Sequence, residues 1–159
     1  MPTTRLSAEE LNMAATVGVR RRIESIGRYQ DTTDRVGRTG WEDDIQGAIA
    51  EYACSKYLRL PWTGVTAHRD DLPGIDVKST RVPDSPLRLI DGYKHIFVHA
   101  YVNHDEVTLH GWARVEDALI ANVPFFTDRK KRRVYEMPII ELLPMTDLRD
   151  WSAKQHRHD

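Results

Sequence analysis

The chain has 159 residues, of which 40% are hydrophobic and 30% are charged, and its formal net charge is -1. This length suits one domain that buries about two-thirds of its unfolded surface, and the balanced charge gives no overall attraction to nucleic acid. No apolar run approaches the roughly 18 residues that a membrane-spanning helix needs, so the composition predicts a soluble protein with no membrane partner.

The N-terminus has no apolar signal-peptide core, and the lone Cys54 has no partner for an internal disulfide. Both observations predict a cytoplasmic location. We interpret Cys54 as a small residue on a helix face.

The first predicted element is a helix within residues 1–30. Ser7 and Glu10 have the spacing of a capping box, and from Leu11 onward apolar residues recur at intervals of three and four. Residues 30–40 are polar, contain two glycines and indicate a linker. We therefore expect the first helix to be an appendage that contacts either DNA or a second subunit in a homodimer.

A second helix is predicted after the linker, ending before Pro61. Thr39 and Glu42 have capping-box spacing, and several alanines favour a continuous helix. Glu51 lies one turn after Gly47 on the same face, and the glycine would let another backbone approach that face. We therefore expect Glu51 to look into a sheet, with a solvated glutamate as the alternative.

A strand is predicted over residues 75–80, where Asp76 and Lys78 project from one face and Val77 lies behind them. A proline-glycine turn before this strand can bring Asp71 close to Asp76. Mg²⁺ prefers carboxylate ligands, and a nearby lysine can orient an attacking water or offset charge on a phosphoryl group. The pattern indicates a small metal-dependent phosphodiesterase site, with a surface ion pair as the alternative.

The rest of the chain predicts further strands, one short helix and a polar end. The strands are expected at about residues 64–69, 95–102, 106–113 and 132–137, the helix near 115–122, and a turn and tail after 142. A turn at 103–105 would make His99 and His110 neighbours across a hairpin. Phe125 and Phe126 are interpreted as half core and half rim, with base stacking as the alternative.

Three features in this order resemble the PD-(D/E)XK nuclease superfamily: a helix with an inward glutamate, a first carboxylate, and an Asp-x-Lys strand. They correspond to Glu51, Asp71, Asp76 and Lys78. The hairpin that ends in Gly111-Trp112 is similar to one in a compact, phage-type branch of that superfamily. The resemblance covers roughly residues 39–145.

The chain departs from the usual superfamily pattern in two respects. Asp76 stands where glutamate is commoner, which the superfamily allows. The proline that accompanies the first carboxylate is missing, with Leu72 next to that place, so Asp70 competes with Asp71 as the first carboxylate. We favour Asp71, because it adjoins the turn and because the two side chains point to opposite sides of an extended chain.

The resemblance implies an α/β fold over residues 39–150, in which helices flank a mixed central β-sheet as in restriction endonucleases, followed by a polar tail at 151–159. It implies a Mg²⁺-dependent deoxyribonuclease that hydrolyses phosphodiester bonds in DNA and accepts Mn²⁺ in place of Mg²⁺. Glu51, Asp71 and Asp76 would be the metal ligands, and Lys78 would complete the catalytic set. A phage or phage-related origin would place the protein in the host cytoplasm.

Basic residues near the Asp-x-Lys strand and in one downstream cluster are the candidate DNA contacts. They are Arg81, Arg88, Arg129, Lys130, Lys131, Arg132 and Arg133. Solvated charge is the alternative interpretation of the cluster. Two other functions remain open: a nucleic-acid-binding module of the same fold that does not cleave, and a structural or assembly protein.

Overall fold

A computed structural model describes residues 1–28, 40–64, 70–93 and 95–155. Most of the expected linker at 30–40, Thr39 of the second capping box, and the expected strand at 64–69 apart from its first residue lie outside the described residues. In chain order the elements are β1 (Thr3–Arg5), α1 (Ala8–Arg28), α2 (Gly40–Leu58), β2 (Ile75–Thr80), β3 (Leu87–Ile90), β4 (Ile96–Asn103), β5 (Glu106–Ala113), α3 (Val115–Ile120), β6 (Phe125–Thr127), β7 (Arg133–Met137), the 3-10 helix η1 (Ile139–Glu141) and α4 (Met145–Gln155).

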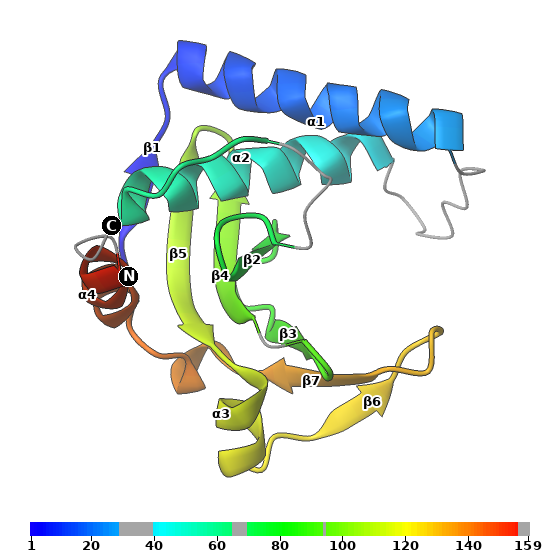
Figure 1. Ribbon diagram of the computed structural model, residues 1–159, viewed down its shortest axis with the longest axis vertical. Coiled ribbons are helices and arrows are strands. Elements are labelled where there is room, and N and C mark those ends of the chain that lie inside the picture. The colour runs from blue at the N-terminus through cyan, green and yellow to red at the C-terminus, as the bar shows by residue number, and fades with distance from the viewer. Residues whose placement is uncertain (29–39, 65–69, 94, 156–159) are drawn as a thin grey trace.

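The described residues form two β-sheets and four α-helices (Figure 1). The first sheet is mixed and has the order β1-β5-β4-β2, with β2 parallel to β4 and the other two pairs antiparallel. The second sheet is antiparallel and has the order β3-β7-β6. The mixed α/β class is as predicted, whereas the second sheet is an addition to the single central sheet that we expected.

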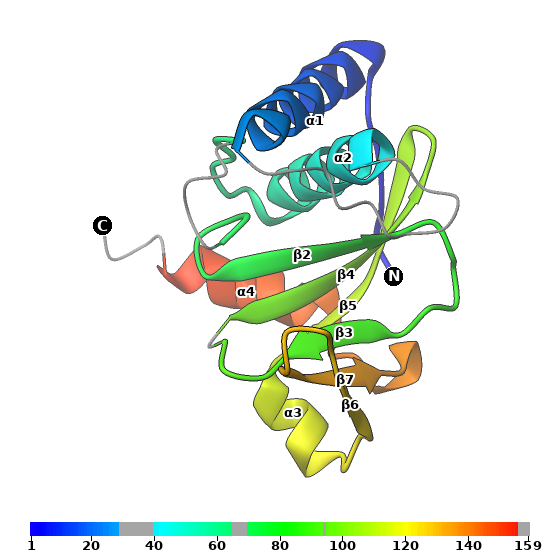
Figure 2. The same ribbon diagram turned by 90° about the vertical axis from the view of Figure 1, so that its right-hand side faces the viewer.

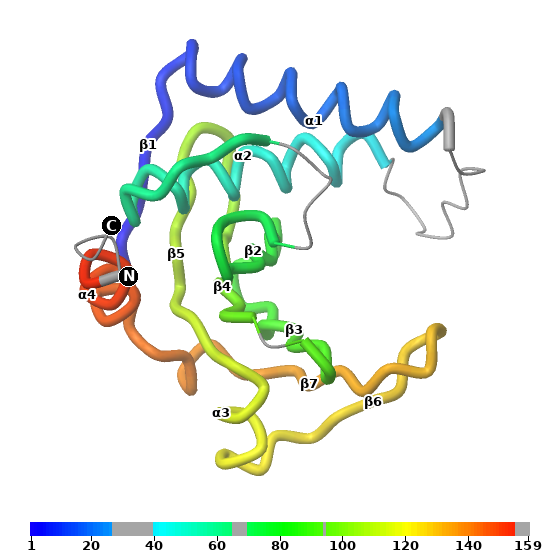
Figure 3. Tube along the Cα trace, viewed as in Figure 1, coloured from blue at the N-terminus to red at the C-terminus, as the bar shows by residue number. Residues whose placement is uncertain are grey.

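The first sheet lies between a pair of helices and the second sheet. Figure 2 shows α1 and α2 on one side of β2, β4 and β5, and β3, β6 and β7 on the other. The Cα trace in Figure 3 has the same layout, with the helix pair and the β6–β7 hairpin at opposite ends. Within the described residues, no helix combines the length and apolarity that a membrane span requires.

The N-terminal segment is built into this layout. The Ser7–Glu10 capping box forms as predicted, with the Glu10 carboxylate accepting from the Ser7 backbone N–H at 2.8 Å. A Cβ on Gly18 would lie 2.5 Å from the Ile45 Cα, so α1 packs against the α2 backbone itself. Because β1 also pairs with β5, residues 3–28 belong to the main fold, and the homodimer contact stays a prediction.

The close approach expected at Gly47 was wrong, since a Cβ there would meet no atom within 4 Å. The two helices make their close contact at Gly18 instead, on the partner helix. A glycine permits close packing only where a second element arrives, and the sequence of α2 alone does not show where that is.

Two apolar cores meet at β4, which is buried on both faces. The face with Val98 and Ala100 joins the core under α2, while Phe97 joins the core formed with the second sheet and α3. A strand covered on both sides has little polar-apolar alternation. It therefore fixes the position of its neighbour β2 between the two layers.

The C-terminal segment differs from the expected turn and tail. α4 begins at Met145 and ends at Gln155, and residues 156–159 lie outside the described residues. Met145 and Leu148 are 2% and 0% exposed and belong to the core under α2. Only these few apolar residues anchor an otherwise polar helix, so the apolar pattern was too sparse to predict it.

Candidate active site

β2 presents the Asp-x-Lys pair as the sequence predicted. The Lys78 ammonium lies 2.8 Å from the Asp76 carboxylate, and Val77 is buried behind them at 7% exposure. The Lys78 Nζ also lies 5.7 Å from the centre of the Phe97 ring, which belongs to the core of the second sheet. The Asp76–Lys78 face of β2 therefore looks away from α2 and toward the second sheet.

A tight turn before β2 brings Asp71 to Asp76. Gly74 has a φ of +70°, which favours glycine, and the Asp71 and Leu72 backbone N–H groups both donate to the Ile75 carbonyl. The Asp71 side chain then folds back and accepts from the Val77 backbone N–H at 2.7 Å. Asp76 is close enough for its carboxyl group to raise the pKa of Asp71.

Asp70 turns away from this pair. One of its oxygens accepts from the Gly74 backbone N–H at 3.1 Å, and the other lies 2.9 Å from the His95 Nδ1. The structure thus brings Asp71, and not Asp70, beside Asp76. Asp70 braces the turn instead.

The Asp71 carboxyl group is in an environment that disfavours its charge. Burial, followed by the negative charges of Glu51 and Asp76, raises the pKa of Asp71 to about 8, although the Val77 N–H acts in the opposite direction. Neighbouring carboxylates resist full ionisation together unless a positive charge joins them. The pair is therefore arranged to share either a proton or a cation.

Glu51 is buried, as predicted, but it is engaged by an arginine. Its two oxygens accept from the two Arg21 guanidinium nitrogens, each at 2.6 Å, and one of them also accepts from the Trp62 indole at 3.0 Å. Glu51 itself is only 4% exposed. Burial acts to lower the pKa of Arg21, but the hydrogen bonds to Glu51 and its charge outweigh this, so the pKa is raised.

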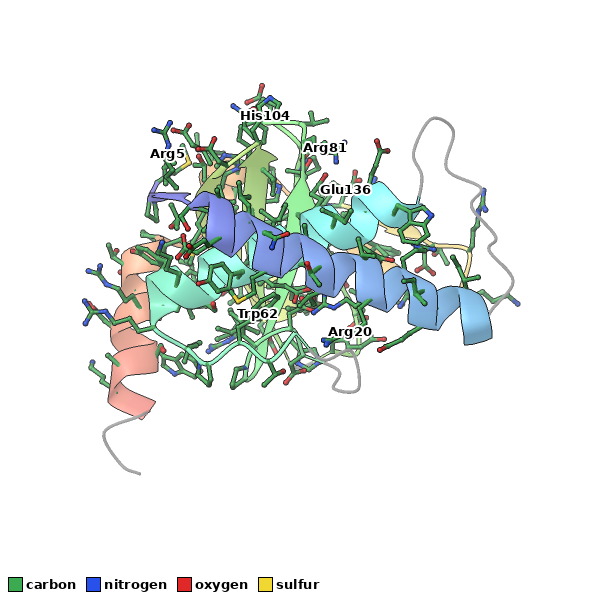
Figure 4. The ribbon with its side chains drawn as sticks, turned by 90° about the horizontal axis from the view of Figure 1, so that it is seen from above. Arg5, Arg20, Trp62, Arg81, His104 and Glu136 are labelled. Atoms are coloured by element: carbon green, nitrogen blue, oxygen red, sulfur yellow. The ribbon has the colours of Figure 1, made fainter. Side chains whose placement is uncertain are left out.

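Arg21 and Trp62 are site residues that the sequence analysis missed. Arg21 appears in the sequence as one of three consecutive arginines, yet it follows Ala14 and Gly18 at spacings of four and three, on the stripe that faces α2. Its position on this stripe was the sequence signal that could have identified Arg21 as a buried residue. Figure 4 places Trp62 on one side of the helix pair and Arg81 on the opposite side.

Two of the three residues that we expected to bind the metal are placed so that they suit a hard divalent cation. Asp71 and Asp76 offer adjacent carboxylate oxygens, the ligand type that Mg²⁺ prefers. Both Glu51 oxygens, however, are already paired with Arg21, and no three His, Cys, Asp or Glu side chains in the described ranges are grouped to hold a metal ion. The role of Glu51 as a direct ligand stays a prediction.

A cleft of about 410 Å³ opens next to Lys78. α2, β2, β3, β4 and the segment between β2 and β3 all contribute to it, with Asp43, Gln46, Val77, Lys78, Ser79, Thr80, Ser85, Pro86, Arg88 and His99 as its lining. The cleft therefore joins the predicted catalytic lysine to one predicted DNA contact, Arg88.

The other predicted DNA contacts lie outside this lining. Arg81 borders a separate hollow beside Tyr101 and Asn103. Residues 129–132 lie between β6 and β7, and Arg133 begins β7. Within this cluster, Arg132 pairs with Asp128 at 2.7 Å. The basic cluster at 129–133 is thus on the β6–β7 hairpin of the second sheet and not beside Asp71 and Asp76.

The predicted histidine pair forms across the β4–β5 hairpin. The Nδ1 atoms of His99 and His110 are 2.8 Å apart, and burial, with the His110 charge, lowers the pKa of His99 to about 4. Its Nε2 lies 3.5 Å from the Ser85 hydroxyl at the cleft. A neutral, buried histidine is thus part of the cleft wall.

Phe125 and Phe126 are not core residues. They are 52% and 41% exposed on β6, an edge strand of the second sheet. The interpretation of this pair as half core and half rim was therefore wrong, since neither ring is in a core. An edge strand of three residues has no layer to cover both rings.

Comparisons of the chain with protein-family models, with curated proteins and with solved structures find no match. The functional assignment therefore rests on the geometry of Asp71, Asp76, Lys78 and the cleft.

Proposed function

We propose that the protein is a metal-dependent deoxyribonuclease of the PD-(D/E)XK type, with α2 and the first sheet arranged as in restriction endonucleases. One observation carries this proposal. The Asp71 and Asp76 carboxyl groups lie together, with the Lys78 ammonium 2.8 Å from Asp76 and facing a cleft. A phage-related origin and a cytoplasmic location belong to the same proposal.

The chain's own residues have distinct roles in this reaction. Asp71 and Asp76 hold the cation, and Mg²⁺, or Mn²⁺ in its place, supplies positive charge and a more acidic water when bound. Asp76 also holds Lys78 in position. The Lys78 ammonium orients the attacking water or stabilises the charge that develops on the phosphoryl oxygens.

The basic residues position the DNA. Arg88 lines the cleft next to Lys78 and would meet the backbone close to the cleaved bond. Arg81 and the cluster at 129–133 would contact phosphates farther away, which adds salt-dependent affinity without selecting a sequence.

A nucleic-acid-binding module that does not cleave is the second candidate. The observation that favours it is the bidentate Arg21–Glu51 ion pair, with both distances at 2.6 Å, because it occupies the third expected metal ligand. Such a protein would keep the cleft and its basic residues and lack hydrolysis.

Metal binding and DNA cleavage in parallel test the proposal. We expect labelled DNA to be cleaved with Mg²⁺ and with Mn²⁺ and to stay intact with a chelator, and we expect Mn²⁺ binding to be measurable by calorimetry. Asp71→Asn and Asp76→Asn should each lose both properties. Asp105→Asn, which changes an exposed, ion-paired carboxylate in the β4–β5 turn, is the matched control and should retain them.

Intact DNA in every metal would contradict the nuclease proposal. If the same protein still bound DNA, that result would favour the binding module.

A further inference from the structure

The face of the second sheet that borders the cleft carries an exposed aromatic ring beside an arginine. Arg88 of β3 and Glu136 of β7 are register partners on this face. The Arg88 guanidinium carbon lies 5.6 Å from the centre of the Phe126 ring, and Phe126 is 41% exposed. Since Arg88 also lines the cleft that contains Lys78, a continuous surface runs from the catalytic lysine to this ring.

The neighbouring residue of β6 repeats the arrangement. The guanidinium carbon of Arg133 lies 5.1 Å from the centre of the Phe125 ring, and Phe125 is 52% exposed. Because successive residues of a strand point to opposite faces, Phe125 lies on the face of β6 opposite to Phe126, and each ring has a guanidinium over it. Such pairs offer flat apolar area together with positive charge.

We propose that this surface binds a single, unpaired DNA strand, with a base stacked on Phe126 and the adjoining phosphates facing Arg88 and Lys78. The inference rests on the proposed action on DNA and names the form of the substrate. Charge complementarity and the exposed Phe126 ring support it together. Aromatic rings bind unpaired bases because every base has a stacking face, whereas the bases of a duplex are already stacked on one another.

The volume of the cleft also favours a single DNA strand as its occupant. Its volume of about 410 Å³ falls within the range of roughly 300 to 1,000 Å³ that is typical of small-molecule sites. One nucleotide of a strand fits such a space, and a double helix does not.

The acidic neighbour Glu136 does not prevent this binding. It pairs with Arg88 at 3.0 Å, but the two side chains are 39% and 64% exposed, so the pair is weak and solvated. Its effect is to hold the guanidinium close to Phe126, and a phosphate can replace it as the partner of Arg88.

The test is fluorescence anisotropy of a labelled single strand and of the corresponding duplex, in a chelator so that neither is cleaved. We expect the parent to bind the single strand at least about tenfold more tightly. Phe126→Ala should weaken single-strand binding by about fivefold to a hundredfold and leave duplex binding unchanged. Phe126→Leu, which keeps apolar bulk without a ring face, should behave like the alanine variant, and Phe126→Trp should bind like the parent.

Trp151→Ala is the matched control, because Trp151 is similarly exposed at 36% and lies on α4, on the opposite side of the molecule from β6 (Figure 1). It should bind both DNAs like the parent. Equal affinity of the parent for both DNAs, or single-strand binding that is indifferent to Phe126, would overturn the inference.

Cleavage of the same two DNAs separates this inference from the nuclease proposal. Metal-dependent cleavage at parental rate by Phe126→Ala, on both substrates, would overturn the inference alone. Single-strand binding that depends on Phe126, without cleavage in any metal, would support the inference and contradict the nuclease proposal.

Discussion

Asp71 is the residue whose environment departs most clearly from that of an ordinary surface carboxylate. It is held by the Val77 N–H on one side and faces Glu51 and Asp76 on the other. With no cation present, the group is best accommodated as the neutral acid. The pKa of Asp71 therefore reflects how close the negative charges of Glu51 and Asp76 lie to it.

This environment predicts how stability depends on pH. The folded-state pKa of about 8 lies above the ordinary value of 3.8, so between these values the unfolded chain binds fewer protons at this residue. The contribution of Asp71 to stability therefore falls as pH rises toward 8. In a chelator, Asp71→Asn should gain thermal stability relative to the parent as pH rises from about 6 to about 8.5. Differential scanning fluorimetry checks this, and parallel pH curves for the two proteins would contradict it.

The buried ion pair of Arg21 with Glu51 leads to a second prediction at the residue scale, which concerns the free energy of unfolding. The Arg21 side chain is 12% exposed and that of Glu51 is 5% exposed, so removal of one partner leaves a buried charge. Arg21→Ala should cost about 3 to 5 kcal/mol of unfolding free energy, and Arg21→Met combined with Glu51→Leu should recover most of it. Arg20→Ala, at a neighbouring residue whose side chain is 56% exposed, should change stability by no more than about 0.5 kcal/mol.

Urea unfolding measures all of these variants. A loss for Arg21→Ala as small as that for Arg20→Ala would show that the ion pair does not hold α1, α2 and the Trp62 segment together.

At the scale of elements, the packing of α1 on α2 rests on one glycine. A Cβ at Gly18 would lie 2.5 Å from the Ile45 Cα, so Gly18→Ala forces the helices apart. We expect a loss of about 1 to 3 kcal/mol from overpacking, against a gain in helix propensity of about 1 kcal/mol. Gly47→Ala is the matched control, because a Cβ there meets nothing within 4 Å. It should stabilise the protein by about 0.5 to 1 kcal/mol.

Thermal and urea unfolding of the two variants check this contrast. Gains of equal size at both glycines would mean that the helices do not approach as described.

Local pattern was enough to predict some elements and not others. The bounds of β2 and β5 match the expected residues 75–80 and 106–113, because polar and apolar residues alternate along them or a clear turn precedes them. β3 and β6 were missed, since strands of four and three residues carry little pattern. In addition, β3 pairs only with β7, which is distant in the chain.

The same division holds within the candidate site. Asp71, Asp76 and Lys78 lie within one turn and one strand, so their spacing alone predicts that they meet. The Arg21–Glu51 pair joins residues 30 positions apart on two helices, and it follows from how α1 packs. The sequence was enough to predict the carboxylates of the site, but it did not show that Arg21 pairs with Glu51.

At the scale of the whole molecule, the two sheets give the site its surroundings. The first sheet and α2 position the carboxylates and Lys78, while the second sheet adds Arg88 and the hairpin with the basic cluster at 129–133. The cleft receives residues from both parts. The proposed catalytic groups and the basic cluster at 129–133 therefore lie on different layers, and a change in one need not disturb the other.

Lys78 separates a nuclease from a binding protein most directly. If its ammonium acts mainly in the transition state, Lys78→Ala should lower the rate of DNA cleavage by about a hundred-fold or more while DNA affinity changes little. Lys56→Ala is the matched control, since Lys56 is also paired with a carboxylate, that of Glu10 at 2.7 Å. It should cleave at the parental rate.

The decisive measurement is therefore hydrolysis of labelled DNA in Mg²⁺ and in Mn²⁺ by the parent, Lys78→Ala and Lys56→Ala, with a chelator control. We expect metal-dependent cleavage by the parent and by Lys56→Ala, and a loss confined to Lys78→Ala. Cleavage that is indifferent to Lys78, or a parent protein that leaves DNA intact in both metals, would contradict the nuclease proposal.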